Sequence, residues 1–206
     1  MAIHPFVYLA SQSPRRRQLL QQLGAEHRLL LADADEDAES LEVVLPAELP
    51  ADYVPRVTLL KLDAARRRLR ARKLPPAPLL TADTTVALGT QILGKPADAT
   101  HARAMLQRLS GRTHRVITSV ALATGRQQWQ ATSVSRVRFA TLPASVIEHY
   151  IASGDSFGKA GAYAIQSALA GWIEHIEGSH SSIMGLPLFE TAQLLQRAGV
   201  AMSLRP

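Results

Sequence analysis

The chain has 206 residues, of which 47% are hydrophobic and 19% charged, a composition typical of a globular domain rather than of a disordered segment. It contains no cysteine, which excludes disulfides, cysteine-ligated metals and thiol nucleophiles. The net charge of +6 suits an anionic partner, and nucleotides, nucleic acid and anionic lipid all meet that description. Aromatic residues are only 5% of the chain, so a stacking platform for single-stranded nucleic acid is poorly supplied.

Targeting and membrane signals are weak in this sequence. The opening segment MAIHPFVYLAS is too short an apolar run for a signal peptide. No apolar run approaches the roughly 20 residues that span a bilayer. We therefore expect a cytoplasmic protein with no membrane partner, for which nucleic acid is also not the expected ligand.

Predicted strands and helices alternate along the chain. Residues 6–10 (FVYLA) predict a short strand, Ser13 and Pro14 are typical of a helix start, and Gly24 is typical of a helix end. Further strands are predicted at 29–31, 79–86, 91–93, 114–123 and 128–139, and helices at 15–23, 53–73, 100–109, 143–153 and 188–198. Residues 154–186 read as rich in loops, with short apolar runs at 162–165 and 172–176. The mixture predicts an α/β (mixed α+β) architecture, and no linker or repeat divides the chain, so a single domain over 1–206 is expected.

The first candidate site is the segment from Ser11 to Arg16, which has the sequence SQSPRR. A helix start offers free backbone N–H groups and a partial positive charge, which suits phosphate. The two hydroxyls of Ser11 and Ser13 and the guanidiniums of Arg15 and Arg16 add further donors. A capped surface helix with solvated arginines explains the same pattern equally well.

Asp83 is the centre of the second candidate site, because it follows an apolar strand and is followed by Thr84 and Thr85. Ligands bind at such strand ends in α/β proteins, and this carboxylate is suited to hold a divalent cation or to activate water. An aspartate that caps a turn is the alternative. Lys95, between Gly94 and Pro96, is positioned to reach phosphate, although this signal alone is weak.

Other charged residues have a less specific signal. Lys61 lies in the largely apolar helical stretch VTLLKLDAA, where a lysine with its head in solvent is the common case. The basic run 66–73 is typical of a solvated helix face. The seven histidines show no metal-ligand spacing, and Walker, GxGxxG, HExxH and GxSxG motifs are absent.

Together these segments resemble the Maf family of nucleotide pyrophosphatases. The family's LASxSPRRxxLL opening, its ADT and KP motifs, its LSGxxHxVxT segment, its KAGAYxIQ signature and its GS…GLPL closure appear in order, respectively at 9–20, 82–84, 95–96, 109–118, 159–166 and 178–188. The resemblance covers about residues 8 to 195, and it implies a two-lobed fold similar to that of inosine triphosphatases, with a central mixed sheet, flanking helices and a substrate cleft. The segment AYxIQ is similar to the branch of the family that acts on dTTP and UTP.

The resemblance also implies roles for individual residues. Asp83 falls on the family's proton acceptor. The family positions that set base preference are occupied here by Arg15, Thr84 and Gln166. Glu36, Lys61 and Lys95 align with charged residues that line the family's site. A Mg²⁺ or Mn²⁺ cofactor held by Asp83 and Glu36, and a homodimer, are implied as well. Whether Asp83 is the base, a metal ligand or both stays open.

The hypothesis that follows is hydrolysis of dTTP or UTP to the monophosphate and pyrophosphate, by water attack on the α-phosphorus. Ser11 and Ser13 would donate hydrogen bonds to the triphosphate, which Arg15, Arg16, Lys61 and Lys95 would neutralise. Gln166 would read the pyrimidine edge, because an amide is both donor and acceptor. Roles in nucleotide-pool house-cleaning and in the arrest of cell division would follow. The alternative is a non-catalytic regulator of septum formation that binds nucleotides or nucleic acid.

Overall fold

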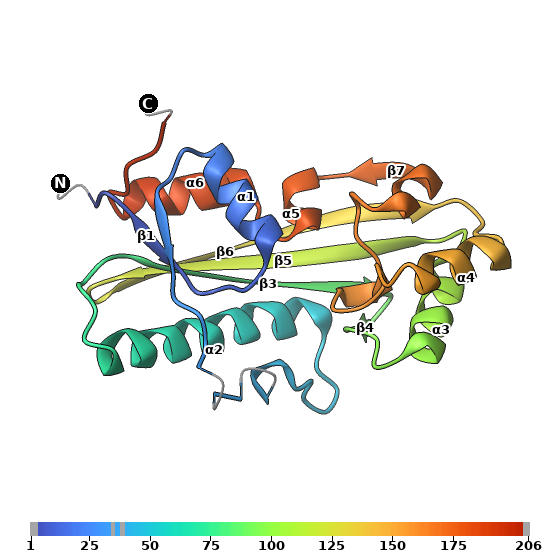
Figure 1. Ribbon diagram of the computed structural model, residues 1–206, viewed down its shortest axis with the longest axis horizontal. Coiled ribbons are helices and arrows are strands. Elements are labelled where there is room, and N and C mark those ends of the chain that lie inside the picture. The colour runs from blue at the N-terminus through green and yellow to red at the C-terminus, as the bar shows by residue number, and fades with distance from the viewer. Residues whose placement is uncertain (1–3, 34–35, 38–39, 204–206) are drawn as a thin grey trace.

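Three long antiparallel strands form the centre of the molecule (Figure 1). The computed structural model describes residues 4–33, 36–37 and 40–203. The long strands are β3 (Leu79–Leu88), β5 (Thr113–Thr124) and β6 (Gln127–Phe139). β5 pairs with β3 along nearly all of β3 and with β6 along the whole of β5. One edge of β3 is therefore almost entirely paired with β5.

Four short strands complete a seven-stranded sheet. β1 (Val7–Leu9) runs parallel to β3, and β2 (His27–Leu29) runs parallel to β1. β4 (Gln91–Leu93) forms a hairpin with β3, and β7 (Ile173–Glu177) is antiparallel to β6. The strand order is β2-β1-β3-β5-β6-β7, with β4 beside β3. This mixed sheet with flanking helices confirms the predicted fold class, whereas the single two-lobed domain stays a prediction.

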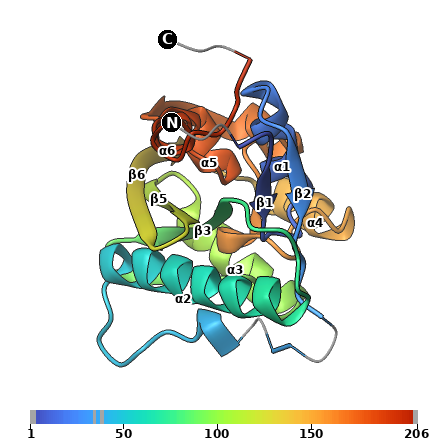
Figure 2. The same cartoon turned by 90° about the vertical axis from the view of Figure 1, so that its left-hand side faces the viewer.

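The helices cover both faces of the sheet, as Figures 1 and 2 show. The long α2 (Pro50–Ala71) packs on one face, and α1 (Pro14–Gln22), α5 (His180–Met184) and α6 (Leu188–Arg197) lie on the other. At the end of the sheet far from both termini lie α3 (Ala99–Leu109) and α4 (Ala144–Ala152). Three short 3₁₀ turns complete the fold: η1 (Ser40–Glu42), η2 (Ala160–Ala162) and η3 (Ala168–Trp172). In the described part of the chain, no helix is both long and apolar enough to cross a bilayer.

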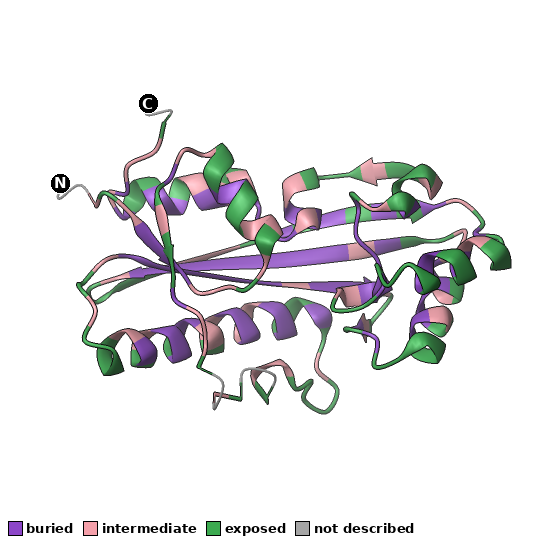
Figure 3. Cartoon of the chain, in the orientation of Figure 1, coloured by how far each residue is buried: buried purple, intermediate pink, exposed green. Residues whose placement is uncertain are grey.

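Side chains of β3 alternate between two separate cores, because successive residues of a strand point to opposite faces. Leu79 packs with residues of α2, whereas Leu80 packs with residues of α1 and α6. Figure 3 shows the buried strands and the buried inner side of α2. The same alternation directs Asp83 to the α2 face and Thr84 to the α1 face.

The free edge of β3 has a gap that positions the site. β1 pairs with Leu79 and Leu80, and β4 pairs with Val86 to Leu88. Among the described residues, no strand pairs with 81–85 on this edge. Asp83 and Thr84 point to opposite faces of β3, and both therefore lie beside this unpaired stretch of the strand edge.

Three local predictions differ from the structure. Strand β2 ends at Leu29, where the predicted strand began, because the apolar residues 29–31 mark the exit of the strand rather than its body. Strand β7 and helix α5 lie within the stretch that was predicted from the sequence to be rich in loops. Their sequence signals are weak, because β7 is an exposed edge strand with charged residues and α5 is only 5 residues long. Arg68, in the basic run, is buried rather than solvated and donates to the Leu30 carbonyl at 2.7 Å.

Candidate functional site

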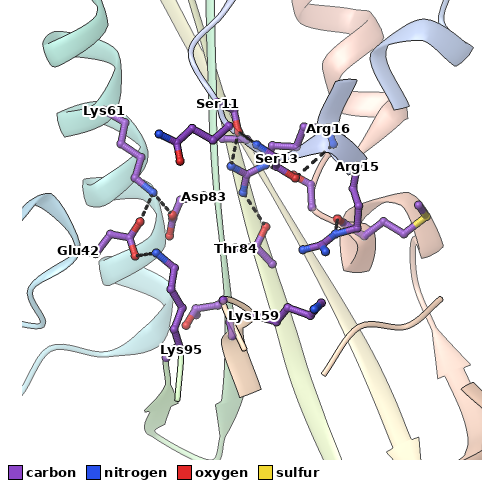
Figure 4. A pocket seen from close by; sticks show the side chains of 18 of the residues that line it. Ser11, Ser13, Arg15, Arg16, Glu42, Lys61, Asp83, Thr84, Lys95 and Lys159 are labelled. Atoms are coloured by element: carbon purple, nitrogen blue, oxygen red, sulfur yellow. Dashed lines mark hydrogen bonds and ion pairs between the residues drawn. The ribbon is translucent and has the colours of Figure 1, made fainter. Parts of the chain in front are cut away.

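A cavity of about 520 Å³ opens at the gap in the edge of β3. Its size lies within the roughly 300–1,000 Å³ of small-molecule sites. Its walls come from the start of α1, the middle of α2, β3, the turn at Lys95, the segment 157–165 and the turn after α5. Figure 4 shows the charged side chains that converge there from these elements. Segments far apart in the sequence thus share one hollow.

Acidic and basic side chains form a charged cluster around Asp83 in the cavity. Asp83 is only 6% exposed, and its Oδ1 accepts a hydrogen bond from the Lys61 ammonium at 2.5 Å. Lys61 also donates to Glu42 Oε1 at 2.7 Å, and Lys95 donates to Glu42 Oε2 at 2.8 Å. The resulting chain alternates carboxylate and ammonium from four different elements (Figure 4).

Glu42 is ionised in this arrangement. Burial alone would raise the pKa of its carboxyl, but the charges and hydrogen bonds of Lys61 and Lys95 outweigh burial and hold the pKa below its ordinary value. Its backbone carbonyl accepts a 3.0 Å hydrogen bond from the Tyr53 hydroxyl, which ties η1 to α2. Burial, together with Asp83 and Glu42, raises the pKa of Tyr53, so this phenol stays a neutral donor.

Arg16 makes three side-chain hydrogen bonds in the cavity. Its helix begins after Ser13, whose hydroxyl accepts the Arg16 backbone N–H at 3.4 Å. Its guanidinium donates to Ser11 Oγ at 3.2 Å, to Thr84 Oγ1 at 3.3 Å and to the Gly185 carbonyl at 2.8 Å. Desolvation lowers the pKa of this guanidinium, against the attraction of Asp83, and arginine nevertheless stays charged in proteins. Gly185 has a φ of 117°, a conformation that glycine adopts without strain.

Arg15 and Lys159 bring positive charge to the opposite wall. Arg15 Nε donates to the Met184 carbonyl at 3.3 Å, and Lys159 Nζ donates to the Phe157 carbonyl at 3.4 Å. Neither side chain has a carboxylate within 4.0 Å among the described residues. Desolvation lowers the pKa of both groups. These two partly buried cations therefore add positive charge to the cavity.

The remaining wall of the cavity is largely apolar and comes from Phe157, Ala160, Tyr163, Ile165, Ile183 and Met184. Gly161 has a φ of 69°, and a Cβ there would lie 2.8 Å from Val86 Cγ2, so only glycine fits against β3 at this point. Behind the wall, the Tyr163 hydroxyl lies 2.7 Å from His114 Nε2. Burial lowers the pKa of His114 to about 4, so this imidazole is neutral.

Most of the predicted site residues lie together. The cavity is lined by Ser11, Ser13, Arg15, Arg16, Lys61, Asp83, Thr84 and Lys95. Gln166 is exposed and follows the lining residue Ile165 without lining the cavity itself.

Glu36 does not contact Asp83 or Lys61 in the structure. Its carboxylate pairs with Arg68 at 2.6 Å, and this hydrogen bond lowers the pKa of Glu36 to about 2. In this structure Glu42, and not Glu36, is the glutamate that contacts the Lys61 ammonium beside Asp83. The metal-binding role of Glu36 stays a prediction.

Sequence reasoning missed Glu42, Lys159 and Tyr53. Glu42 belongs to the acidic stretch 33–48, but no local pattern distinguishes it from Glu36 or from Glu48, which pairs with Arg56. Lys159 opens the KAGAY motif, and that position was a signal for it. In the described ranges, no three His, Asp, Glu or Cys side chains cluster as a metal site made by protein alone.

The chain is similar to known proteins over nearly its whole length. The sequence is 61% identical to the dTTP/UTP pyrophosphatase of Albidiferax ferrireducens over 194 residues, which are 94% of this chain and 97% of that protein. It is 59% identical to the dTTP/UTP pyrophosphatases of Cupriavidus pinatubonensis and Ralstonia nicotianae, over 95% and 98% of this chain and 98% of each relative. Among solved structures, the Staphylococcus aureus Ham1 protein superposes on 65% of this chain and 71% of that one, with a TM-score of 0.42 and 11% identity. The model of the Maf-like protein family matches residues 6–198, and the chain therefore belongs to the Maf family.

Proposed function

We propose that this protein hydrolyses dTTP and UTP to the nucleoside monophosphate and pyrophosphate. The observation that carries this proposal is a single cavity in which the buried carboxylate of Asp83 lies among cations from several elements and beside an apolar wall. A nucleoside triphosphate has the same division into an anionic chain and a flat, weakly polar base. Relatives at about 60% identity that carry the name dTTP/UTP pyrophosphatase support the substrate class.

The triphosphate would lie against the cationic wall. Arg16 presents a guanidinium fork from a helix start, and Ser11 and Ser13 offer hydroxyl donors beside it. Lys61 and Lys95 supply ammonium groups that now contact Glu42 and that phosphate oxygens would share. Phosphoryl transfer depends mainly on such positioning and charge neutralisation.

Asp83 is the group suited to move the proton. A water oxygen attacks the α-phosphorus, the bond from that phosphorus to the bridging oxygen breaks, and pyrophosphate leaves. Asp83 would accept the proton of the attacking water, because Lys61 engages Oδ1 and no described side chain donates to Oδ2. Arg16 lies near enough to Asp83 to stabilise the carboxylate electrostatically.

The donor set fits a divalent cation. Mg²⁺ is commonly bound by one or two carboxylates together with substrate phosphates, and Asp83 and Glu42 already meet on one cationic group, the Lys61 ammonium. Asp83 and Glu42 would hold Mg²⁺ or Mn²⁺, with Glu36 as a further carboxylate only if its segment leaves Arg68. Such an ion, when bound, neutralises charge on the phosphate oxygens.

The test is a product assay with a panel of nucleoside triphosphates, with and without Mg²⁺ or Mn²⁺. We expect metal-dependent release of pyrophosphate and monophosphate, fastest with dTTP and UTP. Release of orthophosphate and diphosphate, or no turnover with any nucleotide, would overturn the proposal.

A non-catalytic regulator that binds nucleic acid is not favoured, because a concave site with a buried carboxylate suits a small substrate better than a polymer. Steeply salt-dependent RNA or DNA binding without turnover would favour that alternative. Assembly as a homodimer and a cytoplasmic location remain predictions, and light scattering of the purified protein would test the first.

A further inference from the structure

Phe157 is a large apolar side chain left 40% exposed at the wall of the cavity. An aromatic side chain in a ligand cavity offers a large apolar face that a ligand can contact. The other strongly exposed phenylalanine, Phe189, is 75% exposed and does not line the cavity. Phe157 is therefore the exposed ring that a ligand in the cavity would meet.

The segment around Phe157 is held by local contacts. The Phe157 N–H donates to the Gly154 carbonyl at 3.3 Å, and the neighbouring Ser156 is fully buried. Gly154 and Gly158 have φ values of 81° and 68°, which permit the tight turns on either side. The ring is thus presented by a compact turn.

Phe157 lines the same cavity as the charged groups, together with several apolar side chains. Asp83, Lys61, Lys95 and Arg16 come from α2, β3 and the elements beside them, whereas Phe157 is followed along the chain by the lining residues Tyr163 and Ile165. Lys159, two residues after the ring, adds a cation at this wall. A nucleotide whose phosphates lie against the cations would turn its base toward the Phe157 wall.

We propose that the Phe157 ring stacks on the nucleobase of the substrate and positions it, an inference that rests on the proposed function. Stacking uses the face of the base, which every base possesses, and so it contributes affinity without discriminating strongly among bases. Phe157 is a binding and positioning residue and takes no part in proton transfer. Discrimination between bases would then depend on groups that contact the edge of the nucleobase.

Steady-state kinetics with the full-length protein test this role. Phe157→Ala should raise KM for dTTP and for UTP by similar factors, on the order of ten-fold, as expected for the loss of one base–aromatic stack, with kcat little changed. Phe157→Leu keeps the apolar volume without a ring and should restore little, whereas Phe157→Trp should restore the affinity. Phe189→Ala is the matched control and should leave KM unchanged.

Inorganic tripolyphosphate separates stacking from a general distortion of the cavity. It carries the phosphates without a base, so its inhibition constant should be the same for wild type and Phe157→Ala. In Phe157→Trp, dTTP should quench the fluorescence of the introduced indole and tripolyphosphate should not.

An equal weakening of tripolyphosphate and dTTP by Phe157→Ala would overturn the stacking role, as would a wild-type KM in that variant. If the wild-type protein turned over no nucleotide, the proposed function would fail by itself. Calorimetric binding of dTTP and tripolyphosphate to wild type and Phe157→Ala would then still decide whether the ring contacts a base.

Discussion

The ammonium of Lys61 lies 2.5 Å from Asp83 Oδ1, so a residue from the middle of helix α2 holds the carboxylate at the open edge of strand β3. The same ammonium lies 2.7 Å from Glu42 Oε1. Two acidic side chains from distant segments therefore share one cation. The positive charge of Lys61 therefore lies between two carboxylates and attracts both of them.

Asp83→Asn should lower kcat by on the order of 100-fold or more, because an amide keeps the size of the side chain but accepts no proton and binds metal poorly. Turnover of dTTP by the purified variant measures the effect. Asp63→Asn, an exposed position on the same helix α2 as Lys61, is the matched control and should behave as wild type. Turnover of Asp83→Asn close to that of Asp63→Asn would remove Asp83 from the chemistry.

Glu42→Gln and Glu36→Gln should differ in their dependence on metal. Glu42 meets Lys61 beside Asp83, whereas Glu36 is paired with Arg68. We expect Glu42→Gln to raise the Mn²⁺ concentration for half-maximal turnover by about ten-fold, within the range found when groups around a metal are changed. Glu36→Gln should leave that concentration near the wild-type value. The reverse pattern would identify Glu36 as the ligand and would imply that its segment moves.

Arg16→Lys should raise KM for dTTP by on the order of ten-fold, because an ammonium cannot replace a guanidinium fork. Arg16 contacts Ser11, Thr84 and the Gly185 carbonyl from three different guanidinium nitrogens. Arg17→Lys changes the exposed neighbouring residue in the same way and should have no effect on KM. Equal KM values for the two variants would show that the contacts of Arg16 serve only the fold.

Gln166→Ala should change the ratio of kcat/KM among dTTP, UTP and other triphosphates, because an amide can both donate to and accept from a base edge. Gln166 is exposed next to the lining residue Ile165, so the substitution should not destabilise the fold. The effect should differ from that of Phe157→Ala, which lowers affinity for all bases alike. An unchanged selectivity profile would exclude Gln166 from base recognition.

His114 should make the folded state less stable in acid. Burial lowers its pKa to about 4 from the ordinary 6.5, so between these pH values the unfolded chain binds a proton that the folded chain does not. Stability from this group is complete above pH 6.5 and falls as the pH decreases to about 4, by roughly 3 kcal/mol at most. Urea unfolding of wild type and His114→Gln at several pH values measures the difference. If the free energy of unfolding depended on pH in His114→Gln as it does in wild type, the result would contradict this assignment.

Local patterns predicted most of the fold, because hydrophobic periodicity and capping residues are local signals. Helix α1 begins at Pro14 after the Ser13 cap, and the pattern of α2 stops before three prolines. Strand β7 was missed because its five residues, IEHIE, do not alternate between apolar and polar, and the strand lies at an exposed edge of the sheet. The structure of residues 154–186 depends on packing against β6 and α3 rather than on a local sequence pattern.

The sequence by itself determined the chemistry that is available: hydroxyls and arginines at a helix start, an aspartate on an apolar strand, and a lysine in a tight turn. Only the tertiary structure decided which of these groups meet. Asp83 and Thr84 point to opposite faces of β3, and they share one cavity because β1 and β4 leave the strand edge open between them. The position of Glu42 beside Asp83 likewise depends on its contacts with Lys61, Lys95 and Tyr53. These residues lie 11 to 53 residues from Glu42 along the chain, and contacts at such separations leave no local pattern in a sequence.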